Sequence, residues 1–374
     1  MNIGFDAKRA YLNESGLGNY ARSLIQSLAQ QFPENHYTLF TPKRNSSDFS
    51  RFISAQKNTS VVQPAGLIDK KLNARWRSYG ITRLLDKNKI EVFHGLSNEL
   101  PFNIQKFKGK KIVTIHDLIF LRHPELYPIL DRKIYDKKFR SACELADVIV
   151  AVSEQTKNDM IEFYKIDPKK INVIYQSCGE AFYKEHSNGS IKEIKTKYKL
   201  PDRYLLYVGT IEERKNLLTL VKALPLVKDI PLVVIGKKKA YHKKVLQEIS
   251  SNHLNKRVAF PENVLYEDLP AIYRGADIFI YPSLFEGFGI PILEAITCKT
   301  PVITTKGGCF EEAGGPGSVY IGPKDPILLA EEINKIIASS EIRMKMAESG
   351  YEHSKKFRPE VIAKEMMKLY KQPK

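Results

Sequence analysis

Apolar and polar residues follow two different spacings along this chain. Short runs rich in Val, Ile and aromatic residues recur, as is typical of buried strands, and amphipathic segments of helical period separate most of them. The segments 18–32 and 73–88 are two such predicted helices. The predicted strands are 2–7, 37–42, 60–65, 91–95, 111–117, 147–153 and 171–176 in the first half, and 204–210, 230–237, 257–260, 277–283, 301–306 and 318–323 in the second.

Strands that alternate with helices predict βαβ units and parallel sheets. A length of 374 residues suits two domains better than one. Segments 145–156 and 275–287 also resemble each other, since each holds an Ala-Asp pair, a buried strand and a polar loop. We therefore predict an α/β protein of two doubly wound, Rossmann-like domains.

The domain boundaries are predicted from polar segments and from the last helix-like stretch. The N-terminal domain is expected to cover 1–180 and to include a returning helix at 360–374. A polar linker is expected at 181–193, and the C-terminal domain at 194–359. Ligands bind beyond the carboxyl ends of parallel strands, so we expect the two sheets to face each other across a cleft.

The net charge of +17 favours anionic partners such as nucleotides or anionic lipid surfaces, although a solvated lysine-rich surface would explain it too. No zinc spacing or aromatic RNA-binding motif supports a nucleic-acid partner. Four cysteines without a CxxC pair indicate reduced thiols and a cytoplasmic location. The chain has no apolar run of the ~18 residues that would span a bilayer, and its start lacks the apolar core of a signal peptide.

The stretch YPSLFEGFGIPILEA, residues 281–295, carries the clearest candidate chemistry. Glu286 is predicted in a loop after a strand, and Glu294 about one turn inside a helix in which Pro291 suits the first turn. Three backbone amides lie between the carboxylates, at the predicted start of this helix: Phe288, Gly289 and Ile290. Helix starts bind anions, so the stretch suits a ligand with hydroxyls at both ends and phosphates between, such as a nucleotide sugar. A glycosidase pair is the alternative interpretation of the two carboxylates.

Other candidate residues also follow predicted strands. Arg214 and Lys215 come just before a helix and could neutralise a diphosphate, although an isolated pair would more often be a solvated basic turn. Gly16 and Gly18 precede an amphipathic helix and could let a phosphate approach their amides, or they simply form a helix-entry loop. His116 follows an apolar strand, where it could act on substrate or serve only as a structural hydrogen-bonding group.

With these motifs, the chain resembles the retaining glycosyltransferases of family 4, which have the GT-B fold. VGTIEERKN and YPSLFEGFGIPILEA carry the resemblance in the second half, and the latter looks like that family's E-x7-E motif. GLGNYARSL, TIHDL and ADVIVAVSEQTKNDM carry a looser resemblance in the first half. The family often has adjacent glycines in its first loop, whereas Leu17 separates them here.

The resemblance implies a role for each candidate residue. Arg214 and Lys215 would bind the donor diphosphate, and Glu294 the ribose hydroxyls. Glu286 would contact the hydroxyls of the donor sugar, and His116 would lie near donor sugar and acceptor. Phe288 and Gly289 would assist Glu286 through their amides. Gly16 and Gly18 complete the predicted donor-binding set.

The resemblance also implies a metal-independent hexosyltransferase that needs no cofactor besides its nucleotide-sugar donor. TIHDLIFLRHPELY resembles mannosyltransferases of surface polysaccharide synthesis, so GDP-mannose is the preferred donor, with UDP-glucose and UDP-N-acetylglucosamine left open. A sugar-nucleotide 2-epimerase and a non-catalytic nucleotide-sugar-binding protein remain alternatives.

A final hypothesis concerns a membrane partner. Lys70, Lys71, Arg75 and Arg77 surround the only tryptophan, Trp76. Cations and Trp both favour an anionic bilayer surface, so we hypothesise peripheral contact with the inner face of the membrane and a lipid-linked saccharide acceptor. A Trp buried in an amphipathic helix is the alternative.

Overall fold

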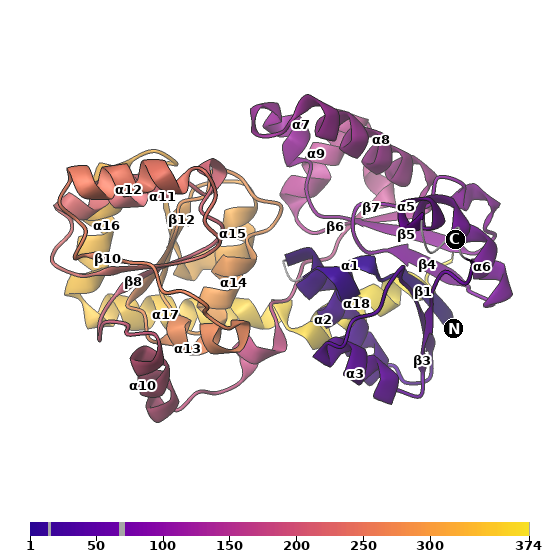
Figure 1. Cartoon of the computed structure of the whole chain (residues 1–374), viewed down its shortest axis with the longest axis horizontal. Coiled ribbons are helices and arrows are strands. Elements are labelled where there is room, and N and C mark those ends of the chain that lie inside the picture. The colour runs from indigo at the N-terminus through magenta and orange to yellow at the C-terminus, as the bar shows by residue number, and fades with distance from the viewer. Residues whose placement is uncertain (14–15, 67–71, 374) are drawn as a thin grey trace. The chain divides into compact units, whose positions relative to one another are not determined.

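The computed structural model describes residues 1–13, 16–66 and 72–373. The chain divides into two compact units, one formed by Met1–Gly179 with Phe357–Lys374 and the other by Glu180–Lys356. We call the first of these unit 1 and the second unit 2. Figure 1 shows the helices and strands of each unit.

Unit 1 is built on a parallel seven-stranded sheet of order β3-β2-β1-β4-β5-β6-β7. Its strands are β1 (Asn2–Asp6), β2 (His36–Phe40), β3 (Thr59–Val62), β4 (Val92–Gly95), β5 (Lys110–Ile115), β6 (Val148–Ala151) and β7 (Ile171–Val173). Its helices are α1 (Lys8–Leu12), α2 (Gly16–Gln31), α3 (Asp48–Ala55), α5 (Asn73–Arg75), the π-helical η1 (Trp76–Gly80), α6 (Thr82–Lys87), α7 (Ile119–Arg122), α8 (Ile129–Leu145), α9 (Glu154–Tyr164) and α18 (Pro359–Lys371). Short 3-10 turns are η2 (Ile104–Lys106), η3 (Pro124–Leu126) and η4 (Pro168–Lys170).

Unit 2 repeats this architecture with six parallel strands in the order β10-β9-β8-β11-β12-β13. The strands are β8 (Leu205–Val208), β9 (Leu232–Ile235), β10 (Val258–Ala259), β11 (Ile278–Tyr281), β12 (Val302–Thr305) and β13 (Val319–Ile321). The helices are α10 (Asn188–Lys197), α11 (Leu217–Ala223), α12 (His242–Ser251), α13 (Leu269–Arg274), α14 (Ile290–Thr297), α15 (Cys309–Gly314), α16 (Pro326–Ala338) and α17 (Ser340–Ser354). The 3-10 turns are η5 (Glu180–Tyr183), η6 (Glu213–Lys215), η7 (Leu224–Leu226), η8 (Tyr266–Asp268), η9 (Gly315–Gly317) and η10 (Lys355–Phe357), which ends in unit 1.

The thirteen predicted strands and the two doubly wound sheets are therefore confirmed. In each sheet the strand order reverses direction beside the first strand, between β1 and β4 and between β8 and β11. Open parallel sheets bind their ligands at this switch point, beyond the carboxyl ends of the strands.

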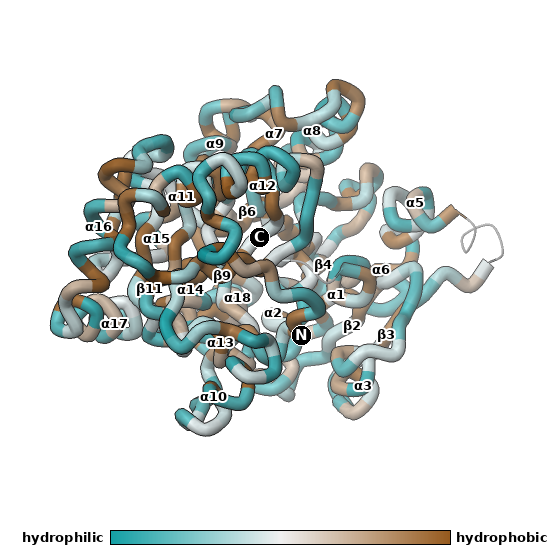
Figure 2. Tube along the Cα trace, turned by 60° about the vertical axis from the view of Figure 1, so that its left-hand side comes forward, coloured by the Kyte–Doolittle hydropathy of each residue, from teal (hydrophilic) through white to brown (hydrophobic). Residues whose placement is uncertain are grey.

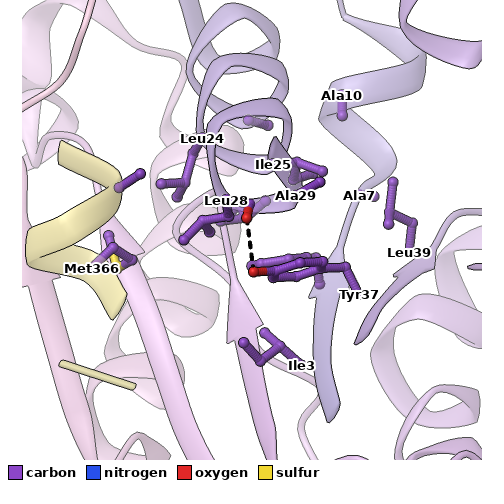
Figure 3. Packing of buried hydrophobic residues seen from close by; sticks show 14 of the residues in the cluster. Ile3, Ala7, Ala10, Leu24, Ile25, Leu28, Ala29, Tyr37, Leu39 and Met366 are labelled. Atoms are coloured by element: carbon purple, nitrogen blue, oxygen red, sulfur yellow. Dashed lines mark hydrogen bonds between the residues drawn. The ribbon is translucent and has the colours of Figure 1, made fainter. Parts of the chain in front are cut away.

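The last helix, α18, packs on unit 1. Met366 lies in the same buried cluster as Ile3 and Leu28, and Tyr37 in this cluster donates a hydrogen bond to the Leu28 carbonyl at 2.9 Å (Figure 3). The Lys110 ammonium donates to two backbone carbonyls at the C-terminal end of α18, those of Leu369 and Gln372. Cations stabilise helix C-termini, so Lys110 fixes this end of the helix.

The segment 181–193, expected to be a polar linker, carries η5 and the first part of α10 and groups with unit 2. Ser187 accepts a hydrogen bond from the Ser190 amide and so caps α10. This cap satisfies a free amide at the start of α10 and so favours a helix in the polar segment. The helix α10 then packs against α13.

Candidate functional site

The strongest candidate site lies at the switch point of the unit 2 sheet. β8 and β11 are hydrogen-bonded neighbours, and each is followed by a loop that carries predicted site residues. Arg214 and Lys215 lie in η6 after β8, and Glu286 lies in the loop after β11. The structure brings these three residues into direct contact.

One oxygen of Glu286 receives most of these contacts. Its Oε1 lies 2.8 Å from Nη1 of Arg214 and 2.5 Å from Nζ of Lys215. The hydroxyls of Ser283 and Tyr281 donate to the same oxygen at 2.6 and 2.9 Å. Burial would raise the pKa of this carboxyl, but Arg214 and Lys215 outweigh it and hold the pKa at about 2. Glu286 is therefore an anion that neutralises two buried cations.

The two cations are held in place from several sides. Arg214 donates to the Phe285 carbonyl at 2.5 Å and pairs with Glu212 at 3.0 Å. Burial opposes the charge of Arg214, but Glu286 raises its pKa above the usual range. Burial lowers the pKa of Lys215, whose Nζ receives a compensating contact from Glu286. Cations fixed beside a sheet edge can accept a second anion without reorganising, which is what a diphosphate site requires.

Glu294 occupies a different environment, in the second turn of α14. It is only 6% exposed, and its Oε2 accepts a hydrogen bond from the Tyr273 hydroxyl at 3.0 Å. Burial raises the pKa of Glu294 to about 8, despite that hydrogen bond. Two glutamates of one motif thus differ in charge at neutral pH, because only Glu286 has cations beside it.

The turn between these glutamates needs a glycine. Gly289 forms the N-cap of α14 with φ of +108°, a conformation that other residues rarely adopt. Pro291 sits in the first turn of the helix, as predicted, and Phe288 is buried. The segment Phe288–Ile290 therefore leads directly from the Glu286 loop into the helix that carries Glu294.

Sequence reasoning missed Asn216, which closes η6. It adopts the left-handed conformation with φ of +55°, and its side-chain amide donates to the carbonyls of Pro282 and Pro323 at 3.0 and 2.6 Å. It thereby ties the loop after β8 to the loops after β11 and β13. The available signal was its place after the Arg-Lys pair, because Asn tolerates left-handed backbone better than most residues.

In unit 1, His116 is buried at the carboxyl end of β5 and both ring nitrogens are engaged. Its Nε2 donates to the Leu96 carbonyl at 2.9 Å, so Nδ1 accepts from the Gln176 amide at 3.4 Å. Burial lowers its pKa to about 4, which keeps the ring neutral at physiological pH. Tyr20 packs edge-on against it at 4.8 Å.

The glycines before α2 differ in what surrounds them. Gly16 has open space where a side chain would begin, whereas a Cβ on Gly18 would lie 1.8 Å from the Asn13 carbonyl oxygen. The Gly18 amide also donates a hydrogen bond to the side-chain oxygen of Asn13 at 3.2 Å. Gly18 is therefore required by the close approach of two backbone segments.

The predicted membrane patch is not organised around an exposed tryptophan. Trp76 is 1% exposed, and Arg77 is buried in ion pairs with Asp6 at 2.5 Å and Glu99 at 2.8 Å. The part of the hypothesis that places Trp76 at a bilayer is wrong, because the apolar core of unit 1 encloses the indole. Lys70 and Lys71 lie outside the described residues.

The described residues contain neither a cluster of metal-ligating side chains nor a membrane-spanning helix. No group of three or more His, Cys, Asp or Glu side chains is arranged there to hold a metal ion. In the same part of the chain no helix is both long and apolar enough to cross a membrane.

Comparisons with known protein families agree with this geometry. Residues 190–353 match the family model described as glycosyl transferases group 1, and residues 15–177 match the one described as glycosyltransferase family 4. This chain is a family 4 glycosyltransferase. The glycosyltransferase has the GT-B fold, as predicted.

The glycosyltransferase is also similar to individual proteins. It is 26% identical over 289 residues to an O-antigen chain mannosyltransferase B of Escherichia coli, covering 76% of this chain and 74% of that protein. It is 30% identical over 249 residues to the serotype-specific mannosyltransferase WbdA of the same species, covering 63% of this chain and 30% of WbdA. The structure of Anabaena HepE, solved with UDP and glucose, matches the whole length of this chain with a TM-score of 0.77 and 16% identity, and the match covers 99% of HepE.

Proposed function

We propose that this glycosyltransferase moves mannose from GDP-mannose to a saccharide acceptor and retains the anomeric configuration. The observation that carries the proposal is the Arg214–Lys215–Glu286 cluster at the switch point of the unit 2 sheet. A donor diphosphate would take over the two cations, whose positions are already fixed. As the bond from the sugar carbon to the diphosphate breaks, its electron pair leaves with the diphosphate and both cations stabilise it.

The other residues take roles around this centre. Glu294 would accept hydrogen bonds from the ribose hydroxyls, and the Glu286 carboxylate, freed by the diphosphate, would bind hydroxyls of the donor sugar. The amides of Phe288 and Gly289 would assist there. Gly16 and Gly18 would let the donor phosphates approach the start of α2. His116, neutral and held by Leu96, would lie near the donor sugar and the acceptor.

Mannose is proposed because the relatives from Escherichia coli are named mannosyltransferases of O-antigen or serotype. HepE, which was solved with UDP and glucose, supports UDP-sugars as the competing donors. Metal independence is part of the proposal, and Arg214 and Lys215 support it because they could supply the positive charge that a divalent ion would otherwise provide. A lipid-linked acceptor at the inner face of a membrane completes the proposal.

The test is a transfer assay with three donors, GDP-mannose, UDP-glucose and UDP-N-acetylglucosamine, each with and without oligosaccharide acceptors and with EDTA. NMR of the product reports both linkage and anomeric configuration. Mannose transfer with an α-linked product, undiminished by EDTA, is expected. A free epimerised sugar formed without acceptor would show the epimerase alternative instead. Binding of every donor without turnover would show a non-catalytic binding protein.

A further inference from the structure

The first two turns of α8 expose an unusual amount of apolar surface. Ile129 and Leu130 are 65% and 69% exposed, and Ile134 is 43% exposed. Soluble proteins scatter single exposed apolar residues, but three within six positions of one helix form a patch. Figure 2 shows brown, hydrophobic segments along the chain beside the α7 and α8 labels.

Leu130 and Ile134 share one face of the helix with two lysines, and Ile129 lies at the edge of that face, one turn before Lys133. Leu130, Lys133, Ile134 and Lys137 follow the i, i+3, i+4, i+7 spacing of a single helical stripe. Both lysines are exposed. The buried residues of α8 lie on the opposite side and pack into the core of unit 1: Phe139, Ala142 and Cys143.

The patch extends beyond α8 to an aromatic residue. The Lys137 ammonium lies 5.9 Å from the centre of the Phe102 ring, which in turn lies 5.8 Å from the ring of Tyr79. Tyr79 is 51% exposed. Lys138 anchors this part of α8 through Glu99 at 3.3 Å, so the surface is held in a fixed position.

We propose that this surface docks the protein on an anionic lipid bilayer. The α8 surface is defined by Tyr79, Ile129, Leu130, Lys133, Ile134 and Lys137. Apolar side chains that enter the interface, lysines that meet lipid headgroups and a tyrosine at the boundary are the combination that such a bilayer binds. A second copy of the chain fits less well, because a two-fold contact would bring the lysines of both copies together.

The acidic groups near the α8 stripe leave its net charge positive. Asp131 and Asp136 are half-buried on the flanks of the stripe, and Asp136 lies 3.4 Å from Arg140. The stripe itself presents only Lys133 and Lys137 as charged groups over its first two turns. The chain as a whole carries +17, which adds long-range attraction to an anionic surface.

The position of the α8 surface along the chain indicates what docking would achieve, and this step rests on the proposed function. β5 ends at Ile115, directly before His116, and the chain then passes through α7 and η3 into the start of α8. The exposed turns of α8 therefore follow the carboxyl edge of the unit 1 sheet, where His116 is proposed to lie near the acceptor. Docking here would bring that edge to a lipid-linked saccharide.

Vesicle co-sedimentation tests the inference without any donor or acceptor. Vesicles of phosphatidylcholine alone and of phosphatidylcholine with phosphatidylglycerol are compared at about 0.15 M salt. We expect wild type to partition onto the anionic vesicles. Lys133→Gln with Lys137→Gln should reduce partitioning by roughly thirtyfold, since each lysine near the surface contributes about fivefold. Leu130→Ser with Ile134→Ser should reduce it by roughly tenfold or more.

Helix α12 offers a matched control, because it exposes Leu246 together with Lys243 and Lys244 in unit 2. Leu246→Ser and the Lys243→Gln, Lys244→Gln pair should leave partitioning unchanged. Unchanged Tm values verify that the exposed substitutions preserve the fold. Equal binding of wild type to neutral vesicles, no binding at all, or an α8 variant that binds like wild type would overturn the inference. Loss of a dimer in sedimentation velocity on substitution of the α8 surface would also overturn it, in favour of a self-association interface.

Failure of this inference and failure of the proposed function are distinguishable. Transfer to a water-soluble oligosaccharide depends on the unit 2 site and should be equal in wild type and in the α8 variants. Vesicle binding depends on the α8 surface and not on the unit 2 site, so it should survive in a protein that lacks transferase activity.

Discussion

Replacing Glu286 by Gln separates the two tasks that the structure gives to this carboxylate. The substitution preserves the size of the side chain and an oxygen that can accept hydrogen bonds, but it removes the charge. Arg214 and Lys215 then remain 15% and 13% exposed with their shared anion missing. Buried cations without a counter-charge destabilise a folded protein.

The magnitude follows from the pKa of Glu286. Burial would raise it, but the two cations lower it from 4.5 to about 2, which corresponds to about 3 kcal/mol of stabilisation at neutral pH. Because the folded pKa lies below the unfolded one, this stability is fully present above pH 4.5 and is lost as pH falls toward 2. Glu286→Gln should therefore lose about 3 kcal/mol at pH 7, and its stability should lack this acid-dependent component.

Urea denaturation at pH 7 measures the loss, and calorimetry with GDP tests the second task. The GDP affinity of Glu286→Gln should equal or exceed that of wild type, since a diphosphate replaces the missing anion. Sugar transfer should fall. Ser283→Ala is the matched control, because it removes one hydrogen bond to Oε1 without changing charge and should cost about 1 kcal/mol. Unchanged stability in Glu286→Gln, or weaker GDP binding, would refute the reasoning.

Further substitutions test the other predicted residues. Arg214→Ala and Lys215→Ala should each remove about 2–4 kcal/mol of transition-state stabilisation and so reduce kcat, while the circular dichroism spectrum stays unchanged. Near-normal turnover in both variants would contradict the assignment. The pKa of Glu294 is raised to about 8 in the folded protein, so its contribution lowers the stability of the fold as pH rises from 4.5 to 8. When ribose hydroxyls bind Glu294, the carboxyl group should release its proton. GDP affinity should thus rise between pH 6 and 8, and calorimetry in buffers of different ionisation enthalpy should show that Glu294→Gln abolishes the release. Gly18→Ala should lower Tm by several degrees while Gly16→Ala does not, and equal Tm values would show that the Asn13 contact is unimportant.

The sequence allowed the two parallel sheets to be predicted, and it placed Arg214, Lys215 and Glu286 directly after strands. Apolar runs between helical segments mark parallel strands, and residues that follow such strands gather at one sheet edge. The sharing of one Glu286 oxygen by both cations could not be predicted, because it depends on how two loops distant in sequence pack together. Asn216 ties those loops, and its role appears only once both prolines it contacts are in place.

Burial was the other quantity that local pattern could not supply. Basic neighbours made Trp76 resemble an interfacial residue, yet Arg77 finds its partners on β1 and after β4, far along the chain. The exposed apolar turns of α8 were equally hidden, since nothing in the local sequence distinguishes Ile129 and Leu130 from core residues. Tertiary packing decides which apolar residues of an amphipathic segment face the solvent.

The return of α18 to unit 1 affects the order in which the protein can mature during synthesis. Residues 180–356 leave the ribosome before α18, so unit 2 has its complete sequence while unit 1 still lacks a helix of its core. Until then the cavity for Met366 and Tyr370 is open, and the His94 imidazole lacks the Tyr370 hydroxyl that lies 2.7 Å from it in the finished protein. Unit 1, whose strands are synthesised first, is therefore the last to complete its core. It is the unit whose exposed apolar surface a chaperone would need to cover during synthesis.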